Sequence, residues 1–197
     1  MRIFGVILAG GTGQRMGGAD KALLPLAGRP LLAHAIERLD PQVERLALSA
    51  NGDPARFASF GLPVLADDIS KGPLSGVLAA LTWAAALGAT AVVTVAVDTP
   101  FFPADLVPRL CLAAERSMSG LAIAQAGVRA HPTFALWPIA LAPSLAAFLA
   151  SDAPPRLMGF ANANGATLAP FPDDGTFANL NTPQDLAGAE AKLRGAP

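Results

Sequence analysis

A glycine-rich stretch with two basic residues follows the first apolar run of the chain. Residues 8–21 read LAGGTGQRMGGADK, with Arg15 and Lys21 set among and after the glycines. Glycine lets the backbone turn with positive φ and bring N–H groups close to an anion. The two cations add charge that stabilises phosphate. The stretch therefore predicts a phosphate-binding loop, and a surface loop without a ligand is the weaker interpretation.

Neither of the two common phosphate-binding motifs fits this stretch. A Walker loop needs lysine directly after its last glycine, whereas two residues separate Gly18 from Lys21. A dinucleotide fingerprint that starts at Gly11 needs a glycine where Met16 stands, and an acidic residue where residues 49–51 read SAN. These departures disfavour an NAD-dependent oxidoreductase.

Strand and helix patterns alternate along the chain and predict the elements that hold this loop. Such alternation predicts an α/β fold with a mostly parallel sheet, in which ligands bind at the carboxyl ends of strands. Strands are expected at residues 2–9, 44–49, 63–66, 91–97, 121–125, 133–137 and 166–171. Helices are expected at residues 31–39, 54–59, 73–87, 104–116, 139–150, 156–161 and 183–193, the last with Thr182 as its N-cap.

Asp98 stands at the end of the predicted strand AVVTVAV, directly before Thr99 and Pro100. Its carboxylate is therefore expected at the same sheet edge as the glycine-rich loop. Mg²⁺ takes one or two carboxylates together with substrate phosphates, which suits this position. A turn or cap aspartate is the alternative interpretation.

Composition limits the classes of protein to consider. The 197 residues are 52% hydrophobic and 15% charged with a net charge of −1, which predicts one domain and disfavours disorder, nucleic-acid binding and a membrane surface. The lone Cys111 points to a reducing compartment, the cytoplasm. The uncharged residues 73–97 divide into a helix and a strand rather than a membrane span, and the first residues are expected to form a strand rather than a signal peptide.

Several segments together carry a family resemblance. After the LAGG stretch come SAN at 49–51, DD at 67–68, GPLSG at 72–76, VDTP at 97–100, HPTFAL at 131–136 and NLNTPQD at 179–185. In this order they resemble the molybdenum cofactor guanylyltransferases, the MobA family. The resemblance implies a Rossmann-like three-layer nucleotidyltransferase fold over residues 1–197, with a nucleotide-binding half at about 1–100 and a molybdopterin-binding half at about 101–194.

The resemblance also implies a reaction and its partners. GMP passes from GTP to molybdenum-molybdopterin with release of pyrophosphate, assisted by Mg²⁺, and transient contact with cofactor biosynthesis proteins or recipient molybdoenzymes is expected. A molybdenum cofactor cytidylyltransferase or another small-molecule nucleotidyltransferase is the alternative. A nucleotide-binding regulator without activity is disfavoured because both Lys21 and Asp98 are present.

Roles for individual residues follow from the same resemblance. Asp67 is expected to bind nucleotide, although the neighbouring Asp68 could exchange roles with it, and the group that reads guanine stays open. The expected catalytic residues are Arg15, Lys21 and Asp98, with Asp98 as the metal ligand. The expected nucleotide-binding residues are Leu8, Ala9, Gly10, Gly11, Lys21, Asn51, Asp67, Gly76 and Asp98, and the expected molybdopterin-binding residues are Arg129, His131, Arg156, Asn179 and Asn181.

Overall fold

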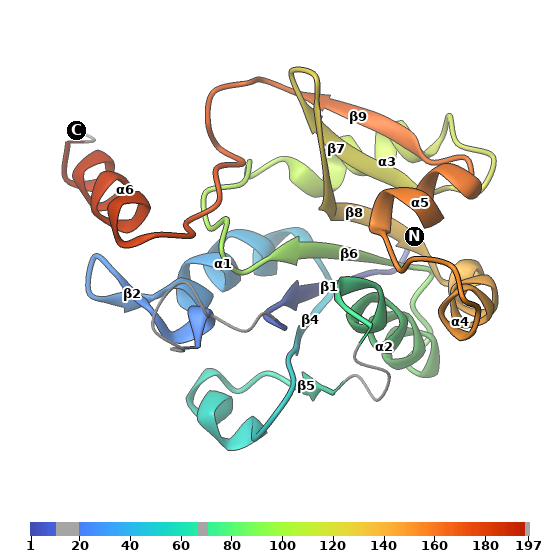
Figure 1. The fold of residues 1–197 in the computed structure, drawn as a ribbon, viewed down its shortest axis with the longest axis horizontal. Coiled ribbons are helices and arrows are strands. Elements are labelled where there is room, and N and C mark those ends of the chain that lie inside the picture. Colours follow the sequence, from blue (N-terminus) through green and yellow to red (C-terminus); the bar gives the residue numbers. More distant parts are fainter. Residues whose placement is uncertain (11–19, 67–70, 196–197) are drawn as a thin grey trace.

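A seven-stranded sheet forms the centre of the computed structural model, which describes residues 1–10, 20–66 and 71–195 (Figure 1). Its strands lie in the order β5-β4-β1-β6-β8-β7-β9, and all neighbours are parallel except β8, which is antiparallel to β6 and β7. The predicted α/β class with a mostly parallel sheet is confirmed. The strands are β1 (Ile3–Leu8), β4 (Arg45–Ser49), β5 (Val64–Leu65), β6 (Ala91–Ala96), β7 (Ala122–Ala126), β8 (Arg129–Pro138) and β9 (Thr167–Phe171).

Helices cover both faces of the sheet. Successive side chains of a strand point to opposite faces, and apolar residues on both faces pack against helices. In β1, Phe4 and Val6 belong to one buried cluster and Ile7 belongs to the other. The cluster of Ile7 packs under α1 (Leu31–Leu39) and α3 (Leu106–Ala114). The cluster of Phe4 packs under α2 (Pro73–Ala86), α4 (Ala142–Ala150) and α5 (Leu157–Ala163), which completes three layers (Figure 1).

The strand order reverses direction at β1, which places a binding crevice there. β1 pairs with β4 on one side and with β6 on the other, so Leu8 lies level with both Ser49 and Ala96. The carboxyl ends of three parallel strands therefore meet at one edge, where ligands of open α/β sheets bind.

The uncharged residues 73–97 divide into α2 and β6, as predicted. Within the described ranges, none of the helices is long and apolar enough to cross a membrane.

Short 3-10 helices join several of these elements. The predicted helix at 54–59 is a 3-10 helix, and the predicted helix at 139–150 begins as a 3-10 turn before α4. In the part of the chain that the structure describes, the 3-10 segments are η2 (Lys21–Leu23), η3 (Asp40–Gln42), η4 (Pro54–Phe60) and η5 (Ile139–Leu141).

A hairpin that the sequence did not predict follows η2 and packs against the C-terminal helix. Its strands, β2 (Pro25–Leu26) and β3 (Arg29–Pro30), are joined by Ala27 and Gly28, both with positive φ. The Ala27 N–H donates to Glu190 of α6 (Pro183–Gly195) at 3.0 Å. Leu26 and Leu31 pack with Leu180 and Ala189 in a separate buried cluster. The hairpin therefore ties η2 to the C-terminal part of the chain (Figure 1).

The predicted N-cap of α6 is present. Asp185 N–H donates to the Thr182 hydroxyl at 3.1 Å, and the Asp185 carboxylate accepts from Thr182 N–H at 2.8 Å and from Asn181 N–H at 2.9 Å. These bonds, led by that of Asn181, lower the pKa of the Asp185 carboxyl. The capping box fixes the direction in which α6 leaves the segment of Asn181.

Strand β8 is longer than predicted and contains a bulge. Ile123 pairs with Ala135 while Ala124 pairs with His131, so residues 132–134 of β8 have no register partners in β7. Pro132 has no N–H to donate, which favours an interruption of the ladder at this place. The bulge lies beside the carboxyl end of β6 and redirects Thr133.

A buried hydrogen bond in the central strand gives a test of the core. Trp137 Nε1–H donates to Thr94 Oγ1 at 2.9 Å, and both residues are fully buried. Thr94→Val keeps the shape but leaves the indole N–H without its partner, so we expect the free energy of unfolding to fall by about 1–3 kcal/mol. Urea unfolding measures this, with the exposed Thr82→Val as a matched control. Equal midpoints for the two variants would contradict the assignment.

Candidate active site

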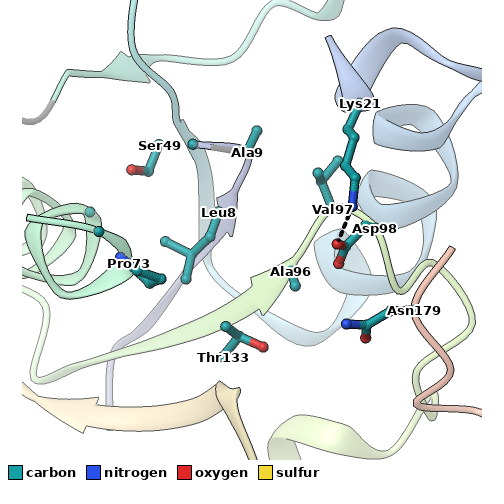
Figure 2. A pocket seen from close by; sticks show the side chains of 13 residues that line it. Leu8, Ala9, Lys21, Ser49, Pro73, Ala96, Val97, Asp98, Thr133 and Asn179 are labelled. Carbon is teal, nitrogen blue, oxygen red and sulfur yellow. Dashed lines mark hydrogen bonds and ion pairs between the residues drawn. The ribbon is translucent and has the colours of Figure 1, made fainter. Parts of the chain in front are cut away.

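A pocket opens at the carboxyl ends of β1, β4 and β6, beside the start of α2 (Figure 2). Residues from both halves of the chain line it, including Thr133 of the β8 bulge and Asn179 before α6. Charged and amide groups gather at one end and apolar groups at the other. The lining residues are Leu8, Ala9, Gly10, Lys21, Ser49, Gly72, Pro73, Gly76, Ala96, Val97, Asp98, Thr133 and Asn179.

The charged end is built on an ion pair between Lys21 and Asp98. Lys21 Nζ lies 3.0 Å from Asp98 Oδ2, and both side chains are about one-fifth exposed (18% and 20%). Lys21 Nζ also donates to the Asn181 side-chain oxygen. Because the pair is partly withdrawn from solvent, its charges act more strongly on a bound group than surface charges would.

The segment before α6 is fixed onto the end of β6. Leu180 N–H donates to the Asp98 carbonyl at 2.7 Å, and the buried Thr99 hydroxyl donates to Asn179 Oδ1 at 2.8 Å and lies 3.3 Å from Asp98 Oδ1. These bonds hold the Asn179 side chain at the pocket, where Figure 2 shows it near Asp98. The amide of Asn179 is therefore oriented by the protein before any ligand binds.

The opposite end of the pocket depends on a glycine in α2. A Cβ at Gly76 would stand 2.6 Å from Ser49 Oγ and 3.2 Å from Leu8 Cδ2, so a larger residue would displace the serine hydroxyl. Ser49 is only 4% exposed, so its hydroxyl lies in a largely buried environment. This end thus offers backbone groups and one hydroxyl in an apolar slot.

The structure brings most of the expected site residues together. Leu8, Ala9, Gly10, Lys21, Gly76, Asp98 and Asn179 line the pocket, and Asn181 joins them through its bond to Lys21. Asn51 lies just beyond β4, where its carbonyl accepts from Arg56. Arg15, Gly11, Asp67 and Asp68 lie outside the described residues. Arg129, His131 and Arg156 do not line this pocket.

His131 is part of an aromatic cluster behind the β8 bulge. Its ring stacks on Phe177 with centroids 4.7 Å apart, and Phe177 meets Phe134 and Phe171 edge-on. Burial, together with the charge of Arg129, lowers the pKa of His131, while Asp173 opposes the change. The His131 ring therefore packs on Phe177, which lies two residues before Asn179 and belongs to the cluster that anchors that segment.

Comparison with known proteins identifies the family. Residues 5–164 match the family model of the MobA-like NTP transferase domain, which is well over half of the chain. The chain belongs to this family. The resemblance predicted from the ordered motifs is thereby confirmed.

Curated relatives agree with this family, and solved structures share the fold. The molybdenum cofactor guanylyltransferase of Cereibacter sphaeroides is 62% identical over 194 residues, which cover 98% of each chain. Molybdopterin-guanine dinucleotide biosynthesis protein A from Archaeoglobus fulgidus superposes with a TM-score of 0.76 at 20% identity, covering 98% of this chain and all of that one (100%). A 4-diphosphocytidyl-2C-methyl-D-erythritol synthase from Anaerococcus prevotii gives 0.74 at 15% identity, with 98% and 96% covered. The predicted nucleotidyltransferase fold is confirmed, and it is shared by proteins named for different nucleotides.

Three hydroxyl residues of the MobA-like site were missed by sequence reasoning. Ser49 and Thr99 stand in the segments SAN and VDTP that carried the resemblance, but no role was inferred for their side chains. Thr133 reaches the pocket through the bulge. A serine or threonine at or shortly after a strand end was the available signal for the first two, whereas the bulge follows from strand pairing that a sequence pattern does not contain.

The environment of His131 predicts a pH dependence of stability. Since its pKa in the folded state lies below the ordinary value of about 6.5, the unfolded chain binds a proton first as pH falls, and stability is lost from about pH 6.5 downward. His131→Phe keeps an aromatic ring on Phe177 but removes the titration. We expect its melting temperature to fall less between pH 7.5 and 5.5 than that of the parent.

His131→Gln separates the titration from the ring stack. Glutamine removes both, so it should lower the melting temperature at pH 7.5 and still show the reduced change toward pH 5.5. Unaltered pH dependence in both variants would mean that the neutral ring contributes nothing to acid sensitivity.

Proposed function

We propose that this chain transfers GMP from GTP to molybdenum-molybdopterin, forming the guanine dinucleotide cofactor and pyrophosphate. The observation that carries the proposal is the Lys21–Asp98 pair at the strand-order reversal, at one end of a pocket whose other end is uncharged. Family membership and the names of relatives 46–62% identical over at least 94% of the chain support the same reaction.

The two ends of the pocket suit the two ends of a nucleoside triphosphate. The phosphates belong at the end of Lys21, whose ammonium group offers donors and positive charge. The base belongs in the slot formed by Leu8, Ala9 and Gly76, where backbone carbonyls can accept from the N1 and N2 hydrogens of guanine. The Ser49 hydroxyl supplies a further polar group at that end.

Asp98 is the candidate ligand of Mg²⁺. The described residues contain no group of three or more His, Cys, Asp or Glu that could form an all-protein metal cage. A single carboxylate at the pocket instead fits an ion that takes most of its remaining ligands from water and substrate phosphate. Bound there, Mg²⁺ would neutralise phosphate charge.

The reaction requires positioning and charge stabilisation rather than a protein nucleophile. A phosphate oxygen of molybdopterin forms a bond to the α-phosphorus of GTP, and the bond from that phosphorus to the β-phosphate oxygen breaks, so pyrophosphate leaves with the electron pair. Lys21 meets the growing negative charge, and Asn181 holds its ammonium group in place. Arg15 is proposed to share this role.

The acceptor is proposed to approach from the C-terminal half of the domain. Residues 1–100 supply the nucleotide end of the pocket, whereas Thr133 and Asn179 come from residues 101–194 and border the same space. Arg129 and His131 lie on the strand that carries Thr133, and Arg156 directly precedes α5. We propose that these residues bind molybdopterin. We also propose that the enzyme is cytoplasmic and contacts other proteins of cofactor biosynthesis, or recipient molybdoenzymes, transiently.

A transfer assay tests the proposed function. Molybdenum-loaded molybdopterin is incubated with Mg²⁺ and with GTP, CTP or ATP in parallel, and the dinucleotide product and pyrophosphate are measured. GTP is expected to give product far faster than the other two. A cytidine dinucleotide as the main product would identify a cytidylyltransferase, and the absence of any dinucleotide would reject the reaction.

Asp98→Asn tests the role of the carboxylate. The change keeps size and removes charge, so we expect kcat to fall by at least about a hundredfold, a barrier increase of about 2.7 kcal/mol, with little change in melting temperature. Asp105→Asn, which alters an exposed carboxylate paired with Arg109, is the matched control. Turnover of Asp98→Asn close to that of the control at saturating Mg²⁺ would assign the metal to another group.

A further inference from the structure

Arg56 of η4 makes a set of contacts that the proposed reaction does not use. Its Nε lies 2.7 Å from Asp20 Oδ2, and its two terminal nitrogens donate to the carbonyls of Asn51 and Asp53. The guanidinium also lies over the Phe57 ring, 4.4 Å from its centroid. One side chain thus joins the loop after β4 to the residue directly before Lys21.

The partner of Arg56 controls the start of η2. Asp20 Oδ1 accepts from Ala22 N–H at 3.0 Å and so caps the short helix that begins with Lys21. The other carboxylate oxygen is the one that Arg56 holds. Asp20 therefore transmits the position of Arg56 to the backbone that carries the Lys21 side chain.

The loop that carries Arg56 is shaped around its guanidinium. Gly52 has φ of +82°, and a Cβ there would lie 3.3 Å from Arg56 Nη1, so glycine serves both the turn and the close contact. Asp53 caps η4 by accepting from Ala55 N–H at 2.9 Å, and Pro54 follows at its first turn. These features fix the backbone from which Arg56 reaches Asp20.

The ion pair between Arg56 and Asp20 is less exposed and has more contacts than an ordinary surface pair. The side chains of Arg56 and Asp20 are 28% and 23% exposed, and the guanidinium has acceptors on three residues in addition to a ring face. Exposed pairs contribute little because both side chains must be ordered for one contact. Here the fork of arginine is held by several contacts, which lysine cannot reproduce.

We infer that Arg56 is a positioning residue that holds Lys21 at the pocket through Asp20. The inference rests on the proposed nucleotidyl transfer and deepens it, because it adds a residue outside the pocket to the group that sets transition-state charge stabilisation. Without Arg56, the Asp20 carboxylate loses its partner and stands next to Lys21 as a competing anion. Misplacement of a charged group by a small distance is enough to lower the rate of a positioned reaction.

Steady-state kinetics of Arg56→Ala and Arg56→Lys test the inference. Arg109→Ala is the matched control, since Arg109 also has an aspartate partner and a ring contact but lies away from the pocket. We expect Arg56→Ala to lower kcat about tenfold with a smaller change in the KM of GTP. Arg56→Lys should recover part of the loss, and both melting temperatures should stay near that of the control. A kcat equal to that of Arg109→Ala would overturn the inference.

A double-mutant cycle separates positioning from direct substrate contact. If Arg56 acts through Asp20, Arg56→Ala should cause little further loss of kcat in an Asp20→Ala background. Additive losses would show that Arg56 acts on the substrate itself and would overturn the positioning role.

Hydrogen exchange provides a readout that does not depend on turnover. Exchange at the Ala22 amide should become faster in Arg56→Ala than in Arg109→Ala, because the Asp20 cap loosens. Unchanged exchange would overturn the inference even if the wild-type chain transferred no guanylyl group. Faster exchange in a protein without transfer activity would support the positioning of Lys21 by Arg56 through Asp20, and it would reject only the proposed function.

Discussion

The ion pair between Lys21 and Asp98 is the interaction on which the architecture of the site depends. The two residues follow different strands, and their charges meet only because β1 and β6 are neighbours with their carboxyl ends level. Both side chains are about one-fifth exposed (18% and 20%), so the pair is partly withdrawn from solvent. It is held by groups around it, since Asn181 binds the lysine and Leu180 binds the backbone of Asp98.

The remaining elements orient groups toward this pair. The bulge in β8 brings Thr133 to the pocket, and the hairpin after η2 shares a buried cluster with Leu180. The Gly76 position lets α2 approach the ends of β1 and β4 closely enough to form a narrow apolar slot. A site with a charged end and an apolar end thus results from packing in three separate parts of the fold.

Much of this arrangement was predictable from the sequence, and the exceptions have physical causes. Hydrophobic periodicity predicted bounds of α1, α2 and β6 that are close to the observed ones. The position of Asp98 after an apolar run predicted that its carboxylate lies at the carboxyl edge of the sheet, where the pocket opens. The hairpin was missed because its strands have two residues each and its turn begins with alanine rather than glycine. Arg56 was missed because its importance comes from contacts with Asp20, which lies 36 positions away in the chain.

The bond between Lys21 and Asn181 spans 160 positions of sequence, which has a consequence for synthesis on the ribosome. Chains emerge from their N-terminal end, so β1 and Lys21 are available long before the segment that carries Asn181. A partly synthesised chain can contain β5, β4, β1 and β6 while Lys21 still lacks its contact with Asn181. The side chain of Asn181 is therefore synthesised long after Lys21, so the contacts around the lysine are completed later than the strands that position it.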